Sequence, residues 1–149
     1  MVWTPRVTVA AIIEQDGHFL MVEEHVGKKQ SAFNQPAGHL EEGESLLQAV
    51  SREVLEETAY PLTAESISGI YRWIAPTGDT YLRVCFCGSV GSPISQALDD
   101  DIIASHWLTL EQIESLGERL RSPLVIDCIK DYLANQRYPL SLFKEPLSR

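Results

Sequence analysis

Three carboxylates, Glu53, Glu56 and Glu57, lie close together in the sequence, because Glu56 and Glu57 follow Glu53 at three and four positions. On a helix, these spacings place the side chains within one arc of about 100°. Like charges at such spacings destabilise an isolated helix by roughly 0.2–0.5 kcal/mol per pair, and the segment holds one arginine, Arg52, and no lysine to offset them. Carboxylate oxygens grouped beside a core are the ligands that Mg²⁺ or Mn²⁺ prefers. The spacing therefore favours a divalent-metal site over a solvated acidic helix face.

The segment around these glutamates has the periodicity of an amphipathic helix. Its apolar residues share one arc at about 100° per residue: Leu46, Leu47, Val50 and Val54. The glutamate arc adjoins this apolar stripe, so its carboxylates should be only partly solvated. We therefore expect a helix over Glu44–Thr58 that presents the glutamates at the edge of a core.

The other predicted elements give this helix a sheet to pack on. Segments rich in β-branched and aromatic residues predict strands or extended chain at Val7–Ile13, Phe19–Val22, Phe33–Ala37, Tyr71–Ala75 and Tyr81–Val90, with a short strand ending at Trp107. Asp16-Gly17 predicts a tight turn between the first two strands. Thr109 with Gln112, and Ser122 with Pro123, predict the starts of two further helices. Together these elements indicate one α/β domain over residues 1–149 with a mixed sheet.

Composition and charge exclude several classes of protein. The chain has 149 residues, 44% of them hydrophobic, and a net charge of −9 from 12 basic and 21 acidic side chains. Its length suits one domain with a sizeable core. The negative charge argues against a nucleic-acid polymer or an anionic membrane as partner. No apolar run approaches the roughly 20 residues that span a bilayer.

Cysteine usage and the N-terminus favour the cytoplasm. Cys85, Cys87 and Cys128 lack metal-site spacing, and we expect all three to be reduced packing residues. Residues 1–6 lack the basic and apolar stretches of a signal peptide. A cytoplasmic protein is the expectation.

The acidic segment resembles the Nudix box, in which Gly, five residues, Glu and seven residues precede Arg-Glu-aliphatic-x-Glu-Glu. The matching residues are Gly38, Glu44, Arg52, Glu53, Val54, Glu56 and Glu57. Seven positions at fixed spacing make this far more specific than a lone glycine motif. Two positions depart, with Ala59 where the family has Gly and Tyr60 where it usually has an aliphatic residue. The resemblance implies the Nudix fold, an α/β/α arrangement with a mixed sheet sandwiched between helices.

The wider chain, from about Val7 to Leu140, resembles the NudJ-type subgroup of bacterial phosphatases. The matching segments are 34–40, 73–76, 121–124 and 136–140. This resemblance implies Mg²⁺-dependent hydrolysis of phosphoanhydride bonds in small organic diphosphates and nucleoside di- or triphosphates. It further suggests the pyrimidine diphosphate intermediate of thiamine synthesis and thiamine diphosphate as substrates. Mn²⁺ is the alternative cation.

The family pattern also implies roles for individual residues of the box. Glu56 and Glu57 resemble the principal metal ligands. Glu53 resembles either a third ligand or the base that activates water, and a carboxylate beside a divalent cation stays ionised for both roles. Arg52 is expected to orient Glu44 or Glu56 rather than to touch substrate.

Two further ligands are expected from outside the helix. The backbone carbonyl of Ala37, just before the box glycine, often joins the metal shell in this family. Many members also draw a carboxylate from a later loop, for which Asp99-Asp100-Asp101 is available. We select Asp101, against the alternative that the three aspartates form a solvated turn.

Substrate contacts are less clearly encoded in the sequence. Phe33 and Trp73 could stack on a ring, Arg83 could meet a phosphate, and His39 could lie near phosphate because it falls inside the box loop. Each has an equally simple alternative as a core or structural residue.

Other functions fit the same motif. ADP-ribose or sugar-nucleotide hydrolysis is one, and a catalytically silent nucleotide-binding module is another. Removal of RNA 5′ pyrophosphate is disfavoured by the charge of −9 and the lack of a basic stripe. A small phosphorylated molecule is the expected partner, and the chain is expected to be a monomer or a homodimer.

Ala59 is where the sequence breaks the family pattern. Glycine there would close the helix in a left-handed conformation, which costs alanine about 1–2 kcal/mol. Because Pro61 can end the helix by itself, we expect either no left-handed cap or a mildly strained Ala59. Glu56 and Glu57 stay in register in both cases.

Overall fold

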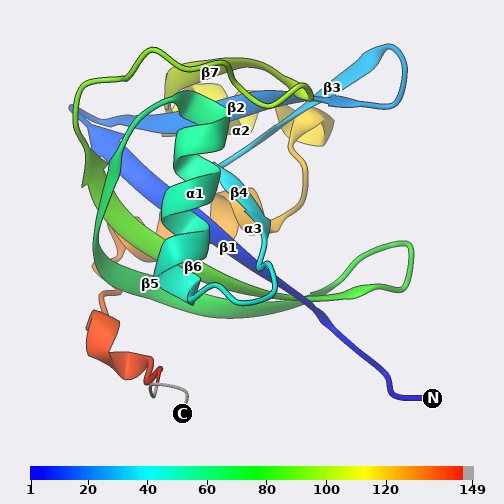
Figure 1. Cartoon of the computed structure of the whole chain (residues 1–149). Coiled ribbons are helices and arrows are strands. Elements are labelled where there is room, and N and C mark those ends of the chain that lie inside the picture. Colours follow the sequence, from blue (N-terminus) through cyan, green and yellow to red (C-terminus); the bar gives the residue numbers. More distant parts are fainter. Residues whose placement is uncertain (146–149) are drawn as a thin grey trace.

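A mixed seven-stranded sheet is the framework of the computed structural model, which describes residues 1–145 (Figure 1). Its strands are β1 (Arg6–Gln15), β2 (His18–Val26), β3 (Gln30–Asn34), β4 (Ala37–His39), β5 (Leu62–Ile74), β6 (Thr80–Val90) and β7 (Ile102–Thr109). The strand order is β3-β2-β1-β6-β5, with β4 paired to β1 and β7 paired to β2. β1 runs parallel to β6 and antiparallel to β4. The sheet is therefore mixed, as predicted.

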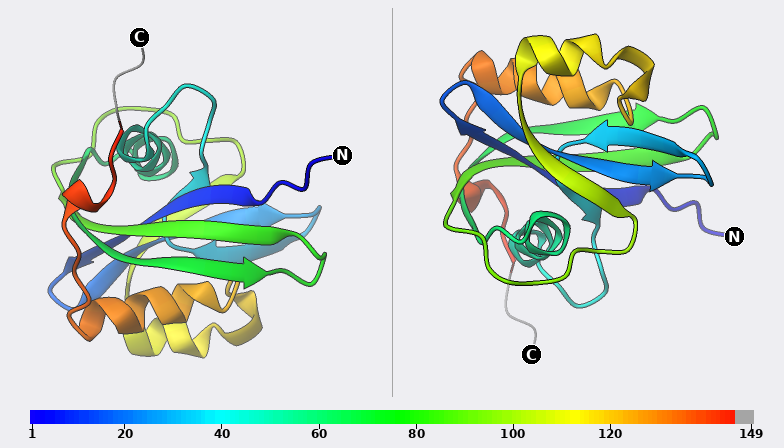
Figure 2. Two further views of the ribbon diagram at one scale, coloured as in Figure 1. Left: turned by 90° about the horizontal axis from the view of Figure 1, so that it is seen from below. Right: turned by 90° about the horizontal axis from the view of Figure 1, so that it is seen from above.

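Helices cover both faces of the sheet (Figure 2). They are α1 (Leu46–Thr58), α2 (Leu110–Ser115) and α3 (Leu124–Leu133), with short 3₁₀ segments η1 (Gly117–Arg119) and η2 (Leu140–Leu142). One buried cluster joins α1 to the sheet through Val50, Val54 and Phe86. A second cluster joins α3 to the other face through Cys85 and Ile129. The predicted α/β/α layering is confirmed.

The first hairpin forms as its turn residues predict. Asp16 and Gly17 both have positive φ, at 50° and 76°, and Gln15 pairs with His18 across the turn. Positive φ at both central residues matches the right-handed twist of the two strands.

Several element boundaries differ from the predicted ones, among them the extended end of β2 at Val26. α1 begins at Leu46 rather than Glu44, because Ser45 caps the helix in a capping box with Gln48. β5 begins at Leu62, whereas the sequence predicted a strand only from Tyr71. Its first half escaped prediction because two β-bulges, near residues 65 and 68, break the alternation of side chains.

Two further differences concern the segment that contains β3 and β4 and the start of α3. The predicted extended segment Phe33–Ala37 is divided, because β3 ends at Asn34 and β4 begins at Ala37. α3 begins at Leu124, and the Ser122 hydroxyl accepts a hydrogen bond from the Leu124 N–H at 3.2 Å. The start of α3 thus lies one or two residues beyond the predicted one.

The three cysteines are buried and free, as predicted. None of the helices within residues 1–145 is long and apolar enough to cross a membrane.

The end of α1 decides between the two alternatives for Ala59. Ala59 has φ 64° and ψ 10°, the left-handed conformation, and its N–H donates to the Leu55 carbonyl. Its side chain is buried at 8% exposure. The helix therefore closes as it would with glycine, and alanine carries the strain.

We expect Ala59→Gly to raise the free energy of unfolding by about 1 kcal/mol, because the Cβ no longer crowds the neighbouring carbonyl. The expected rise in Tm is about 2–4 °C, measured by thermal denaturation. The matched control is Ala134→Gly, since Ala134 also caps a helix but has φ −79°. The control should be neutral or slightly destabilising. Equal effects at both positions would contradict the assignment of strain to Ala59.

Candidate active site

α1 and β4 approach each other closely at Gly38. A Cβ on Gly38 would collide with the carboxyl group of Glu53. Glycine at this position therefore lets the Glu53 side chain pass the edge of the sheet. This is the physical reason for glycine at the start of the box.

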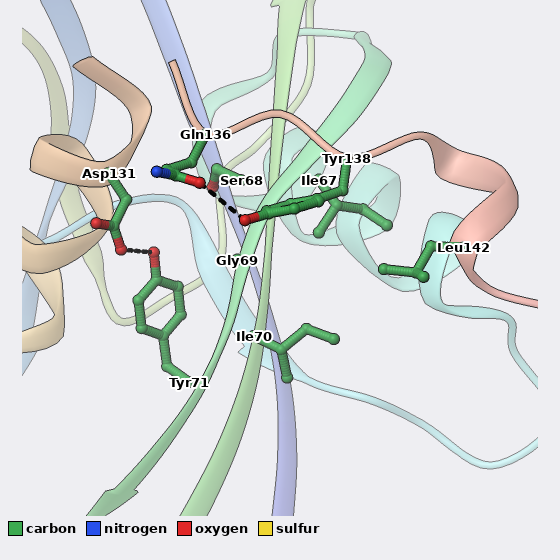
Figure 3. A pocket seen from close by; sticks show the side chains of 9 residues that line it. All are labelled: Ile67, Ser68, Gly69, Ile70, Tyr71, Asp131, Gln136, Tyr138 and Leu142. Carbon is green, nitrogen blue, oxygen red and sulfur yellow. Dashed lines mark hydrogen bonds between the residues drawn. The ribbon is translucent and has the colours of Figure 1, made fainter. Parts of the chain in front are cut away.

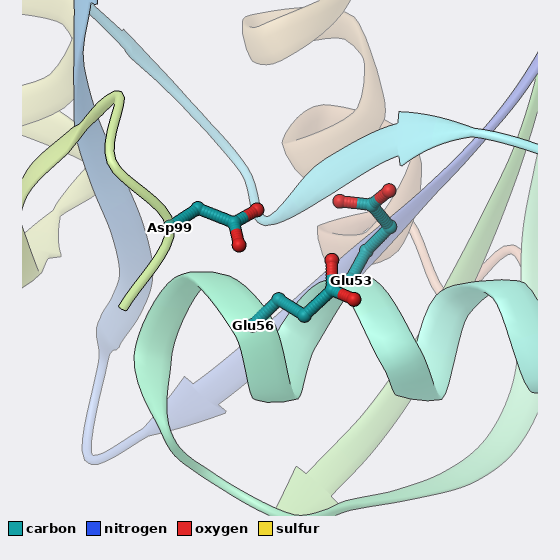
Figure 4. Close-up of side chains that lie close together, drawn as sticks. All are labelled: Glu53, Glu56 and Asp99. Carbon is teal, nitrogen blue, oxygen red and sulfur yellow. The ribbon is translucent and has the colours of Figure 1, made fainter. Parts of the chain in front are cut away.

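Three carboxylates from two elements form an acidic cluster (Figure 4). One carboxylate oxygen from each of Glu53, Glu56 and Asp99 lies within 4.8 Å of the others. Asp99 belongs to the loop between β6 and β7, and its N–H donates to the Glu56 carbonyl at 3.0 Å. Hard oxygen donors at this separation fit a divalent cation such as Mg²⁺.

The loop contributes Asp99 to this cluster, in place of the predicted Asp101. Asp101 lines the same cleft, but its carbonyl accepts from the His25 N–H at 2.8 Å, so its backbone is tied to β2. The predicted Asp101 is therefore not among the three grouped carboxylates, and a metal ligand from this loop stays a prediction.

Arg52 links the carboxylates of the box. Its Nε and Nη2 donate to the two oxygens of Glu44 at 2.9 and 2.7 Å. Its Nη1 donates to Glu53 at 2.8 Å and to Glu56 at 3.3 Å, and Nη2 reaches the His39 carbonyl at 3.1 Å. The guanidinium therefore orients three carboxylates at once and does not line the cleft.

Glu57 lies deeper than the acidic cluster. It is 7% exposed, and one of its oxygens accepts from the Ala37 N–H at 2.9 Å. Burial raises the pKa of Glu57 to about 9 and, more weakly, that of Glu53 to about 7. Both groups line the cleft, and both are hard to ionise without a cation nearby.

The cleft itself has a volume of about 730 Å³. Its floor is the sheet face around β1 and β6, and its rim includes the β5–β6 hairpin and the residues before α3. Trp73, Tyr81 and His39 form one side, with ring centroids 5.7 Å apart for Trp73–Tyr81 and 6.3 Å for Tyr81–His39. The cleft therefore joins an acidic region to an aromatic one.

The sequence had selected Trp73 and His39 but not Tyr81. The predicted strands at 71–75 and 81–90 held the necessary signal, because the register of a hairpin between them pairs Trp73 with Tyr81.

Phe33 does not reach the cleft. It is 6% exposed, and its ring packs against His106 at 5.6 Å and beneath the Arg119 guanidinium at 4.9 Å. The structure therefore gives Phe33 a packing role, which was one of the two alternatives for this residue.

A second, smaller hollow lies beside β5 and the C-terminal segment (Figure 3). Within it Tyr71 donates to Asp131 at 2.6 Å and Tyr138 donates to Gln136 at 2.8 Å. Its polar groups already satisfy one another, and it holds one carboxylate instead of a cluster. Of these two hollows, the larger one is lined by members of the acidic cluster.

A family model, the NUDIX domain, matches residues 3–127 of the chain. The chain belongs to the Nudix family. Phosphatase NudJ of Escherichia coli (strain K12) is 40% identical over 139 residues, which cover 93% of this chain and 90% of that protein. The similarity therefore covers nearly the whole length of both this Nudix chain and that phosphatase.

Solved structures agree with the family assignment. A NUDIX hydrolase from Nitrosomonas europaea has a TM-score of 0.93 and 46% identity, covering 96% of this chain and 98% of that one. A MutT protein from Methanosarcina mazei has a TM-score of 0.72 and 25% identity, covering 92% and 100%. This Nudix protein is thus a phosphohydrolase that acts on phosphoanhydride bonds.

Proposed function

We propose that the chain is a Mg²⁺-dependent hydrolase of small organic diphosphates and nucleoside di- or triphosphates. The observation that carries this proposal is the acidic cluster of Glu53, Glu56 and Asp99 at one end of a cleft whose side is aromatic. The acidic end suits a phosphate bridged by cations, and the aromatic side suits a planar organic group. The resemblance to NudJ-type phosphatases favours the pyrimidine diphosphate of thiamine synthesis and thiamine diphosphate as substrates.

The residues divide into three roles in this proposal. Glu56 and Glu57 would hold the cation, with Asp99 as a third ligand and the Ala37 carbonyl as a further candidate. A bound divalent cation neutralises phosphate charge and lowers the pKa of water. Glu53 accepts the proton of the attacking water or serves as a further ligand, and Arg52 keeps its oxygen in place.

The aromatic side of the cleft is proposed to contact the organic part of the substrate. Trp73 and Tyr81 offer ring faces and edges, and His39 borders them. Stacking of this kind contributes roughly 1–3 kcal/mol per ring in other sites that bind bases. It tolerates many rings, which fits an enzyme with several substrates.

A phosphate-release screen tests the proposal. It compares nucleotides, ADP-ribose, sugar nucleotides and thiamine-pathway diphosphates, each with Mg²⁺ and with chelator. Release from the organic diphosphates in Mg²⁺ alone supports the proposal. Preference for ADP-ribose or sugar nucleotides would favour the rival hydrolase, and nucleotide binding in calorimetry without any turnover would favour a silent module.

A further inference from the structure

Arg83 is a buried cation on the wall of the cleft. Its residue exposure is 6%, and it comes from β6, in register with Thr8 of β1 and Tyr71 of β5. None of its hydrogen-bond partners is a carboxylate: they are Gln35 Oε1 at 2.9 Å, Asn34 Oδ1 at 3.2 Å and Cys128 Sγ at 3.8 Å. A buried guanidinium is therefore held without a carboxylate in contact.

Four other arginines of the described residues are paired with acids. Arg52 pairs with Glu44, and Arg121 pairs with Glu24 at 3.1 Å. Arg119 and Arg6 pair with Glu23 and Asp79. Among the ion pairs formed within residues 1–145, Arg83 takes part in none. The most deeply buried of these cations is thus the one without a carboxylate in contact, an arrangement that is costly unless an anion arrives from outside.

Neutral amides fix the guanidinium in place. Gln35 is 1% exposed, and its Nε2 donates to the Val125 carbonyl of α3 at 2.7 Å. This bond leaves Gln35 Oε1 to accept from Arg83, so the orientation of the amide is determined. Asn34 also lines the cleft. A structural link between β6 and α3 would need only neutral groups, whereas this network positions a positive charge.

We propose that Arg83, positioned by Asn34 and Gln35, forms an anion subsite that binds a phosphoryl group of the substrate directly. The subsite rests on the proposed function and refines its substrate class. One phosphoryl group would be bound where the acidic cluster can hold a cation, and a second would contact Arg83. Substrates with two linked phosphoryl groups therefore bind better than phosphate monoesters.

Asn34→Asp tests the subsite without removing any side-chain contact. The new carboxylate, nearly identical in shape, lies beside Arg83 Nη2 and supplies the missing anion. The fold should be as stable or more stable, because the buried cation gains a partner. Substrate affinity should fall, because the internal carboxylate competes with the phosphoryl group. We expect KM for a diphosphate substrate to rise about tenfold with kcat within about threefold.

Two arginine variants and one control complete the test. Arg83→Met removes the charge and should raise KM about 10- to 100-fold, and Arg83→Lys, which lacks the planar fork, should lie between it and wild type. Ser89→Asp adds the same negative charge at an exposed position of β6 and should leave KM unchanged. If Asn34→Asp and Arg83→Met both keep the wild-type KM, with or without a change in Tm, Arg83 is structural and the subsite is overturned.

Binding of methylenediphosphonate, a non-hydrolysable P–C–P probe, separates this inference from the proposed function. Calorimetry is performed in Mg²⁺ with wild type and Asn34→Asp. If wild type hydrolyses nothing in the screen but binds the probe, and the variant binds it about tenfold more weakly, the subsite stands while the proposed function fails. Turnover by wild type with equal probe affinity in both proteins overturns the subsite alone. Absence of probe binding to wild type also overturns it.

Discussion

Glu53→Gln is expected to lower kcat by about 100- to 10,000-fold, the range for loss of a general base. Glu53 is the innermost member of the acidic cluster, at 8% exposure, and Arg52 holds one of its oxygens at 2.8 Å. The amide keeps this shape and hydrogen bond but cannot accept a proton from water. The fold should survive, because burial already raises the pKa of the Glu53 carboxyl to about 7 and a neutral group avoids that desolvation.

A titration with Mg²⁺ identifies the role of Glu53. If it is the base, the loss of kcat persists at saturating Mg²⁺ and the apparent metal affinity changes little. If it is a ligand, excess Mg²⁺ restores part of the turnover. Glu65→Gln, which removes one carboxylate from an exposed position of β5, is the matched control and should retain wild-type kcat. A kcat for Glu53→Gln within a few-fold of wild type would show that Glu53 has neither role.

Glu56→Gln should behave differently from Glu53→Gln. The Glu56 side chain is 36% exposed and contacts Arg52 at 3.3 Å, so it is more accessible than Glu53. Loss of a ligand should remove most activity and weaken the dependence on Mg²⁺, while relief of crowding leaves the metal-free fold intact or slightly more stable. Near-normal activity at saturating Mg²⁺ would reject Glu56 as a ligand.

Local sequence signals predicted the elements that carry the site and failed where tertiary contacts decide. The spacing of Glu53, Glu56 and Glu57 predicted one helix face, and the structure places Glu53 and Glu57 on the cleft wall and Glu56 beside Glu53 in the acidic cluster. The first half of β5 was not predicted, because its bulges shift the side-chain period. The sequence left two alternatives for the end of α1, a strained left-handed Ala59 or a helix without a left-handed cap. It could not decide between them, because Pro61 can end the helix by itself.

Local sequence signals also could not show which aspartate of the β6–β7 loop joins the acidic cluster. Asp99 and Asp101 have the same chemistry and are two residues apart, so no periodicity distinguishes them. The backbone decides, because the Asp99 N–H is bound to α1 and the Asp101 carbonyl is bound to β2. The role of Phe33 also depends on a tertiary contact, because Arg119, which is distant in sequence, covers its ring.

Glu57 should make the metal-free protein less stable as pH rises. Burial raises the pKa of Glu57 from 4.5 to about 9 in the folded chain. Between these values the unfolded chain has released the proton and the folded chain retains it. The unfolded state then binds fewer protons, so the free energy of unfolding falls with increasing pH. Glu53 acts in the same direction between 4.5 and about 7.

We expect this loss to be on the order of 3 kcal/mol between pH 5 and pH 9 in chelator, or a fall in Tm on the order of 10 °C. Glu57→Gln removes the titrating group, so the slope should flatten and Tm at pH 8 should exceed that of wild type. Glu65→Gln, with the same change in charge at an exposed position, should keep the wild-type slope. Thermal denaturation across this pH range measures all three proteins.

Added Mg²⁺ should reverse the trend for wild type. A cation binds the ionised carboxylates, so its binding releases the protons that burial retains, and its affinity increases with pH. The rise in Tm on adding Mg²⁺ should therefore be small at pH 5 and large at pH 8. This rise in Tm should be largely lost in Glu57→Gln, because the variant lacks one carboxylate that could bind the cation. A wild-type Tm in chelator that stays level or rises from pH 6 to pH 8 would show that Glu57 is already ionised without a cation. In that case its burial beside the Ala37 N–H is not the source of the coupling between metal and proton.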